Sequence, residues 1–141
     1  EYLLIDRTTP ADERGNPATL PLGDSHAVRA GQEVLVRVRI RANQNLEYMA
    51  FEDPLPSGFE VSDGFDDPYS WTYWYSRKEV RDNRVVVFAG SIPKGEERVY
   101  EYVMVPERPG DYLVMPTTAW SMYYPDQHAR GASARIRVVP R

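Results

Sequence analysis

The sequence has no cysteine, only two histidines and no long apolar run. Without cysteine, the chain forms no disulfide, no thiolate zinc site, no cysteine nucleophile and no thioester of its own. Two histidines do not suffice for a multi-histidine metal site. No apolar run approaches the roughly 18 residues that a membrane-spanning helix needs. We therefore predict no cofactor, no metal ligand set and no direct membrane span.

An excess of charge of one sign is also lacking. The 17 basic and 21 acidic residues leave a formal net charge of −4, which excludes a basic nucleic-acid-binding protein and an acidic disordered tail. The chain begins at Glu1 and shows no charged segment followed by an apolar one, so no signal peptide is recognised. We interpret the chain as a processed form or an excised fragment whose compartment is not readable from targeting signals.

Short strands and turns account for most of what is present. The 12 prolines and ten tyrosines favour strands over helices. The clearest pattern is in Glu33–Arg41, where valine or isoleucine alternates mostly with arginine. A period of two residues predicts a strand with one buried and one solvated face. No segment shows the apolar spacing of an amphipathic helix over three turns.

Turn signals recur at intervals of roughly ten residues and suggest about seven to nine strands. We expect the strand Leu46–Glu52 to end at Asp53-Pro54, because proline donates no hydrogen bond to a sheet. The sequence predicts one all-β domain over residues 1–141, an antiparallel β-sandwich that is immunoglobulin-like in the broad sense. Within it, residues 1–30 should form a first strand followed by an irregular crossing segment.

A group of acidic residues raises the question of calcium. Asp63, Asp66 and Asp67 lie close together, with Glu60 nearby, and carboxylate clusters of this kind bind calcium in some proteins. No glutamate closes an EF-hand loop at its twelfth position. A solvated acidic loop is the favoured interpretation, and calcium binding stays open.

Aromatic residues are concentrated in the predicted strand Trp71–Val80. The side chains of Trp71, Tyr73 and Tyr75 share one face, and Trp74 lies on the other. Aligned rings on a sheet stack sugars or bases, or they fill the space between two sheets. Packing is the favoured interpretation. The alternative is a carbohydrate-binding module that uses Trp71, Tyr73 and Tyr75.

No arrangement of residues indicates catalysis. There is no G-x-S-x-G motif and no glycine-rich phosphate loop. His26 and His128 fall in predicted loops, where a surface histidine is more common than a general base. We therefore expect a protein that is not an enzyme.

The segment Met122-Tyr123-Tyr124-Pro125 places three large side chains beside a proline. Methionine adapts its shape to a partner, and tyrosine offers contact area with a polar end. The segment is therefore either a contact loop or an ordinary strand end whose rings pack under the sandwich. Its residues alone do not decide between the two.

Four segments resemble macroglobulin-like domains and occur in the same order as in them. They are Tyr48–Gly58 (YMAFEDPLPSG), Glu79–Phe88 (EVRDNRVVVF), Val99–Tyr112 (VYEYVMVPERPGDY) and Pro116–Gly131 (PTTAWSMYYPDQHARG). Together they extend over about Asn45 to Val138, which is most of the chain. The chain resembles the C-terminal macroglobulin-like domain of bacterial alpha-2-macroglobulins.

The resemblance implies a module of a large, broad-spectrum inhibitor of proteases in the periplasm, from an exported or membrane-anchored parent. In such proteins a protease cuts a bait region, the molecule rearranges, and a buried Cys–Gln thioester acylates the protease. The terminal domain packs on the helical thioester domain and on neighbouring macroglobulin-like domains of the same chain. By this match, Met122 and Tyr123 are the candidates for covering the thioester. Tyr124 stands where a small or acidic residue is expected.

A third interpretation is a generic adhesin or cell-surface domain without a ligand of its own. A parent chain with a Cys-Leu-Glu-Gln-like motif in a helical stretch would favour the inhibitor over both alternatives.

Overall fold

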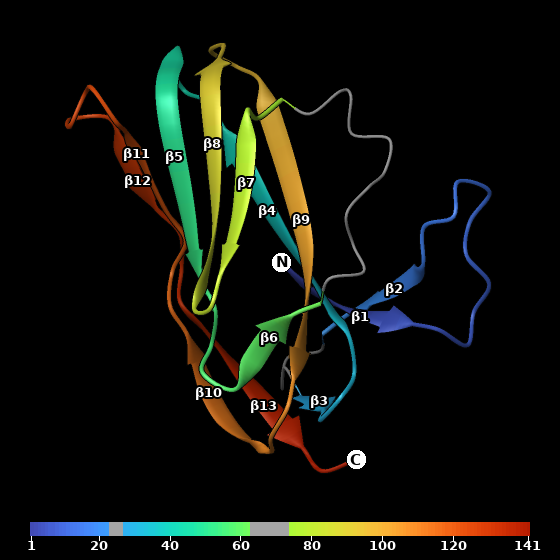
Figure 1. The fold of residues 1–141 in the computed structure, drawn as a ribbon. Coiled ribbons are helices and arrows are strands. Elements are labelled where there is room, and N and C mark those ends of the chain that lie inside the picture. Colours follow the sequence, from blue (N-terminus) through green and yellow to red (C-terminus); the bar gives the residue numbers. More distant parts are fainter. Residues whose placement is uncertain (23–26, 63–73) are drawn as a thin grey trace.

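The computed structural model describes residues 1–22, 27–62 and 74–141, and these ranges contain 13 strands and no helix (Figure 1). The predicted all-β sandwich is therefore confirmed. Nothing in the described ranges is a helix of the length and apolar character needed to cross a membrane. Acidic residues 63, 66 and 67, aromatic residues 71 and 73, and histidine 26 lie outside the described residues.

Two five-stranded sheets form the body of the sandwich. The first sheet has the order β2-β1-β4-β9-β6 and consists of β1 (Tyr2–Asp6), β2 (Ala18–Pro21), β4 (Val34–Arg41), β6 (Phe59–Val61) and β9 (Glu97–Pro106). The second sheet has the order β12-β11-β5-β8-β7 and consists of β5 (Leu46–Pro54), β7 (Arg77–Arg81), β8 (Arg84–Ile92), β11 (Thr118–Ser121) and β12 (His128–Arg130).

A small third sheet closes one end of the sandwich (Figure 1). It has the order β10-β13-β3 and consists of β3 (Ala27–Arg29), β10 (Gly110–Val114) and β13 (Ala134–Val139). β13 and β3 pair in parallel, whereas the other described pairings are antiparallel. The predicted antiparallel sandwich thus contains one parallel pairing, between two strands that are distant in sequence.

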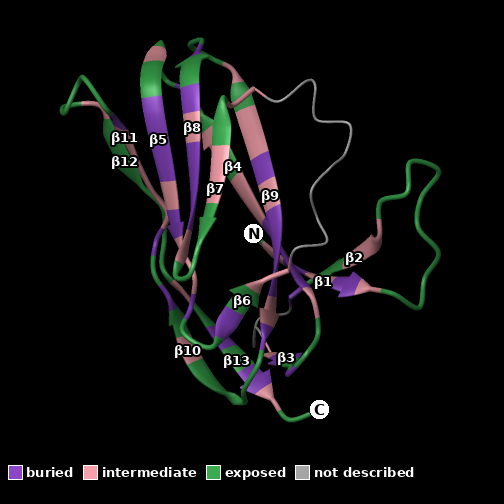
Figure 2. Ribbon diagram, viewed as in Figure 1, coloured by how far each residue is buried: buried purple, intermediate pink, exposed green. Residues whose placement is uncertain are grey.

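The core lies between the inner faces of the two large sheets. In β4, Val34 and Val36 are buried in this core, as the period of two residues predicts. The opposite face begins with Leu35, which is buried in a small second cluster, and continues with arginines, of which Arg37 pairs with Glu101 of the neighbouring β9 (2.5 Å). Figure 2 shows buried segments along β5, β8 and β9 in the middle of the molecule. Alternation in the sequence therefore selects the core face of the strand.

The structure has more strands than predicted because several are very short. β3, β6 and β12 have three residues each, and β2 and β11 have four. Segments of this length show too few alternations to be recognised by periodicity. β2 and β3 also fall within residues 1–30, where one strand and an irregular crossing segment were expected.

Three strand boundaries also differ from the predictions. β5 continues through Pro54, which still pairs with Arg84 of β8. On the other edge of β5, Pro54 lies beyond the pairing of β11 with Glu52, so its missing N–H removes no bond to β11. Trp74–Ser76 is a bend, and β7 begins only at Arg77. His128 lies in β12 rather than in a loop.

Replacing Phe51 tests the core. Phe51 is 1 % exposed and meets the ring of Trp74 at 5.9 Å. Phe51→Ala should lower the free energy of unfolding by about 3–5 kcal/mol, because it removes apolar contacts and leaves a cavity. Denaturant unfolding of the purified chain measures the change. Val80→Ala is the control, because Val80 is 50 % exposed and its loss should change stability by less than about 0.5 kcal/mol.

Candidate functional site

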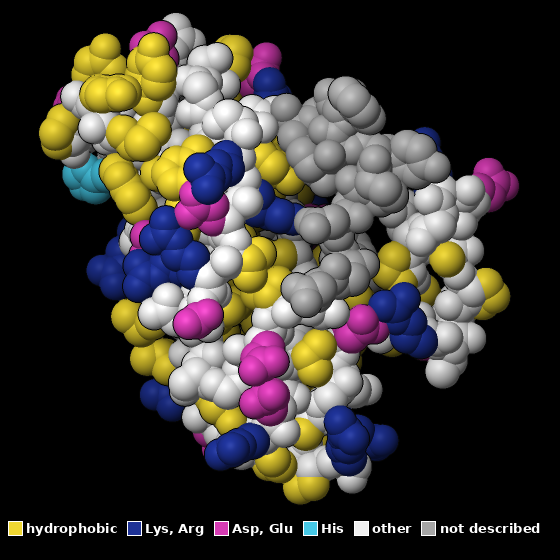
Figure 3. All heavy atoms as spheres, in the orientation of Figure 1, with side chains coloured by type: hydrophobic (Ala, Val, Ile, Leu, Met, Phe, Trp, Pro, Cys, Tyr) yellow, Lys and Arg dark blue, Asp and Glu magenta, His cyan; other side chains and the backbone are white. Residues whose placement is uncertain are grey.

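The candidate site is the loop that joins β11 to β12. Its three large side chains are exposed to solvent: Met122 is 47 % exposed, Tyr123 68 % and Tyr124 48 %. In Figure 3, apolar side chains gather at the upper left, over this loop and the adjacent end of β5. Of the two sequence interpretations, the structure shows exposed side chains rather than rings packed under the sandwich.

Ser121 fixes the backbone of this loop. Ser121 is only 3 % exposed. The Oγ hydroxyl donates to the Glu47 carbonyl (3.0 Å). The same Oγ accepts the backbone N–H groups of Tyr123 (3.4 Å) and Tyr124 (3.2 Å). One buried hydroxyl thus connects the loop backbone to β5 while the large side chains point away.

Gln127 closes the loop from its other end. The Gln127 N–H donates to the Tyr124 carbonyl, and the Ser121 N–H donates to the Gln127 carbonyl, both at 2.9 Å. These bonds satisfy backbone groups that would otherwise lose their partners at the turn. The loop therefore has a defined backbone although its tip is exposed.

Tyr48 of β5 completes the exposed group. Its ring meets Tyr123 edge-on, with the centroids 4.9 Å apart and the planes at 89°. Its carbonyl accepts the Met122 N–H (2.9 Å), and Tyr48 itself is 48 % exposed. We call the four residues Tyr48, Met122, Tyr123 and Tyr124 the Met-Tyr cluster.

Tyr48 was missed by the sequence reasoning, which placed it inside a regular strand. Among the described residues it is the one non-glycine with a positive φ, at 50°. This left-handed conformation is unfavourable for a side chain with a Cβ. No sequence signal marks it, since tyrosine in an apolar run is ordinary strand composition. In the structure it coincides with the contacts of Tyr48 with Met122 and Tyr123 of the loop.

The aromatic residues of the alternative hypothesis are partly described. Trp74 donates from Nε1 to the Val99 carbonyl (2.8 Å), and the ring of Tyr75 meets that of Trp74 edge-on at 5.4 Å. Both rings pack against the core from the edge of the sandwich. Trp71 and Tyr73 lie outside the described residues, so a sugar-stacking face made with Tyr75 stays a prediction.

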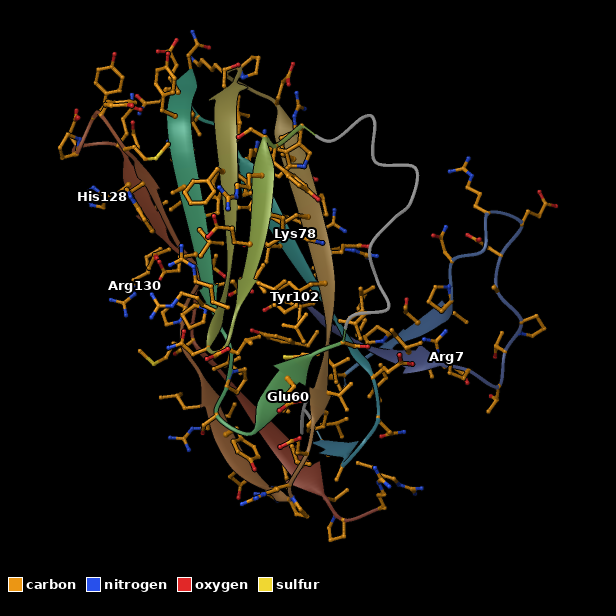
Figure 4. The ribbon with its side chains drawn as sticks, in the orientation of Figure 1. Arg7, Glu60, Lys78, Tyr102, His128 and Arg130 are labelled. Atoms are coloured by element: carbon orange, nitrogen blue, oxygen red, sulfur yellow. The ribbon has the colours of Figure 1, made fainter. Side chains whose placement is uncertain are left out.

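The described residues contain no group of three His, Asp or Glu side chains that could hold a metal ion. The exposed His128 lies on β12, next to Arg130 in Figure 4, and faces Trp120 of β11 across the strand pair. The residues brought together at the Met-Tyr cluster offer contact area and phenol hydroxyls. This chemistry suits binding rather than bond breaking.

A buried carboxylate holds the strand that leads to the loop. Asp53 is 2 % exposed and accepts the Tyr102 hydroxyl (2.6 Å) and the Thr117 hydroxyl (2.7 Å). Figure 4 shows Tyr102 inside the sandwich. These bonds join β5 and β9 to the segment just before β11. Burial raises the pKa of Asp53, although the two hydroxyls oppose that shift.

The surrounding tyrosines stay protonated. Burial, and then the charge of Asp53, raise the pKa of Tyr100 and Tyr102 well above the ordinary value of a phenol. The Tyr100 hydroxyl is buried without a hydrogen-bond partner among the described residues. The residues around Asp53 therefore bury polar groups at some cost in stability.

A family model, the bacterial alpha-2-macroglobulin MG10 domain, matches residues 4–126 of the chain. The chain belongs to this family. The resemblance inferred from the four sequence segments is thus confirmed. The MG10 match ends inside the loop between β11 and β12, so it includes the whole Met-Tyr cluster.

Solved structures show the same fold. A mutant of alpha-2-macroglobulin from Salmonella has a TM-score of 0.72 and 24% identity, covering 99% of this chain and 9% of the other. A segment of native Escherichia coli alpha-2-macroglobulin, from domain MG7 to the C-terminus, has a TM-score of 0.72 and 21% identity. It covers 99% of this chain and 23% of the other.

Curated relatives are much longer than this MG10 domain. An alpha-2-macroglobulin homolog of Yersinia pestis is 28% identical over 158 residues, which is 92% of this chain and 7% of the relative. The circularly permutated Ras protein 2 of Dictyostelium discoideum is 28% identical over 109 residues, which is 77% of this chain and 3% of the relative. The chain thus spans a small part of the length of both relatives.

Removing the anchoring hydroxyl should loosen the Met-Tyr loop of this MG10 domain. Ser121→Ala leaves the Glu47 carbonyl and two N–H groups without that partner, at a cost of about 1–2 kcal/mol. The amides of Tyr123 and Tyr124 should exchange about tenfold faster, measured by NMR hydrogen exchange. The exposed Ser133→Ala is the control. Equal exchange in both variants would show that Ser121 does not hold the loop.

The raised pKa of Asp53 predicts a pH dependence of stability. A carboxyl with a raised pKa binds its proton more tightly in the folded chain. The free energy of unfolding therefore falls as pH rises from the ordinary aspartate pKa through the raised one. Asp53→Asn should remove this contribution. Carboxylates with a lowered pKa, such as Glu33 beside Arg7, stabilise the folded chain more as pH rises. The Asp53→Asn change should leave their contribution unaltered.

Urea unfolding of both chains between pH 3 and pH 8 measures this difference. The exposed Asp111→Asn serves as control, because Asp111 pairs with Arg137 on the surface. The free energy of unfolding of Asp53→Asn, minus that of the original chain, should increase as pH rises, because only the original chain loses the contribution of the raised pKa. A gap that is constant with pH would mean that Asp53 titrates alike in the folded and unfolded chain.

Proposed function

We propose that this chain is a non-catalytic module of a bacterial alpha-2-macroglobulin-type, broad-spectrum protease inhibitor in the periplasm. In this role it packs on the thioester domain and on neighbouring macroglobulin-like domains of one parent chain. Its Met-Tyr loop covers the thioester until the bait region is cleaved. The observation that carries the proposal is the exposure of Met122, Tyr123 and Tyr124 on a loop whose backbone is held by Ser121.

The chemistry of the cluster fits this role. A thioester hydrolyses when water reaches it, so its cover must exclude water and yet leave on a conformational signal. Large, contiguous apolar side chains at a protein surface mark sites of contact with other proteins or domains. Methionine and tyrosine supply this area, and each phenol hydroxyl retains a polar group for the rim of the contact.

The anchoring supports the same proposal. Because the loop backbone is held by Ser121 and Gln127 before any partner binds, little conformational entropy is lost on docking. Tyr48 holds the ring of Tyr123 edge-on and so belongs to the covering surface. Tyr124 is equally exposed, although it departs from the family pattern at that position.

A full-length inhibitor carrying this chain provides the test. Met122→Ala and Tyr123→Ala should each shorten the lifetime of the intact thioester, measured by uptake of methylamine. Losing about 1.4 kcal/mol of cover stability would accelerate the uptake about tenfold. Both residues are exposed in the isolated chain, so the variants should fold with nearly unchanged melting temperature.

Leu113→Ala is the matched control, since Leu113 is 52 % exposed on β10 of the small sheet, at the other end of the sandwich (Figure 1). Its thioester lifetime should equal that of the original protein. An unchanged lifetime in the Met122 and Tyr123 variants would remove the covering role. The test requires a parent with an intact thioester, so the thioester is first quantified in the original protein.

A further inference from the structure

The outer face of the second sheet carries apolar side chains at its centre. Phe51 of β5 packs in the core, so Ala50 points outward, and the strand register places Phe88 of β8 and Trp120 of β11 on either side of it. Ala50 is 1 % exposed, whereas the two aromatic residues are partly exposed. A sheet face that borders water carries mostly polar side chains. The apolar centre therefore favours a face that contacts another protein surface.

The arginines on the β7 side of this face have carboxylate partners. Arg84 pairs with Glu52. Arg77 and Arg81 both pair with Glu79, at 2.9 and 2.7 Å. Their charges are therefore largely compensated within the chain.

The β12 side of the same face differs, because its charge is not compensated. Antiparallel pairing places His128 opposite Trp120, and Arg130 opposite Thr118. His128 and Arg130 are exposed and lie on the outer side of the sandwich in Figure 4. Within the residues that the structure describes, Arg130 forms no ion pair. A guanidinium binds a carboxylate through two parallel hydrogen bonds, so this side of the face favours an acidic partner.

Trp120, His128 and Arg130, which we call the β11–β12 face, adjoin the Met-Tyr cluster. The Met-Tyr loop begins directly after β11, and Met122 follows Trp120 after one residue. In Figure 3 the apolar side chains at the upper left continue downward beside the histidine, which is cyan. The cluster and the β11–β12 face therefore form one continuous surface.

The Met-Tyr cluster alone is small for a stable cover. Its four side chains are 47–68 % exposed and offer roughly 400 Å², since a fully buried aromatic side chain contributes about 150–250 Å². A stable protein–protein interface buries about 800 Å² on each partner. Central contact residues are also surrounded by further contacts that exclude water, as the cover of a thioester requires. The adjacent β11–β12 face supplies such surrounding area.

We propose that the contact made by the Met-Tyr cluster continues over the β11–β12 face and ends on an acidic surface of the thioester domain. Trp120 packs against an apolar part of that domain, and Arg130, with His128 beside it, binds carboxylates at the rim. This inference rests on the proposed function and adds to it the extent of the contact and the chemistry of the partner's surface.

Reversing the charge of Arg130 in the full-length inhibitor tests the acidic partner. Arg130→Glu should accelerate methylamine uptake about fivefold, because like charges then face each other across the rim. Arg130→Lys keeps the charge and should have a smaller effect. Arg135→Glu is the matched control, since Arg135 is also exposed and lies opposite Leu113 in the small sheet. The three positions of substitution are on the surface, so melting temperatures should match.

Removing the aromatic side chain tests the apolar part of the contact. Trp120→Ala should accelerate uptake about as much as Met122→Ala does. Because Trp120 is only partly exposed, circular dichroism of the variant confirms that it is folded. A folded Trp120→Ala variant with unchanged uptake would remove Trp120 from the contact and overturn the proposal.

A cross-link identifies the partner directly. In the Arg130→Lys variant, a water-soluble carbodiimide joins the new amine to a nearby carboxylate as an amide, and mass spectrometry locates the linked residue. In the native inhibitor this residue should be an aspartate or glutamate of the thioester domain. The link should be lost once a protease has cut the bait region. Arg135→Lys should give no link to the thioester domain.

The outcomes separate this inference from the proposed function. If Met122→Ala and Tyr123→Ala accelerate uptake but Arg130→Glu does not, the β11–β12 face lies outside the cover and the inference is overturned, while the covering role stands. A link from position 130 to any part of the parent chain other than the thioester domain also overturns it. If the loop variants leave uptake unchanged and the link to the thioester domain still forms, the covering role fails and the inferred contact stands.

Discussion

The pairing of β11 with β5 is the constraint on which the rest of this domain depends. Ser121 lies opposite Met49 in this pairing. The Ser121 hydroxyl therefore lies close enough to donate to the Glu47 carbonyl, and the Met122 N–H close enough to donate to the Tyr48 carbonyl. A shift of one residue would turn Ser121 away from β5 and exchange the faces of the strand. β5 is held in turn by its long pairing with β8 and by Phe51 in the core.

Asp53 reinforces this arrangement from the other end of β5. Its carboxylate accepts hydroxyls from Tyr102 and Thr117, and Thr117 directly precedes β11. A buried polar cluster contributes less stability than an apolar core of the same volume, but it restricts which strands can lie together. In this domain it specifies where β11 starts relative to β5 and β9.

The Met-Tyr cluster arises at the end of a sheet pairing. The cluster lies where β5 and β11 stop pairing. Strand ends release backbone and side chains from the core, which is why binding residues concentrate there. The proposed contact with a thioester domain uses this place.

The predictions from sequence succeeded where a long pattern repeats. β4 and β9 alternate over many residues, and four family-like segments identified the domain type. They failed where the signal is short: β3 and β12 were not recognised, and the parallel pairing of β3 with β13 has no local signature. The candidate residues Met122 and Tyr123 came from resemblance and composition, and Tyr48 was missed because nothing local distinguishes it.

The sequence by itself determined the all-β class, the core face of the long strands and the family, because side-chain alternation and turn residues are local properties. Tertiary structure decided the exposure of the Met-Tyr loop and the left-handed conformation of Tyr48. Each of these depends on where a distant strand begins or ends, and that position follows from the packing of the whole core rather than from neighbouring residues.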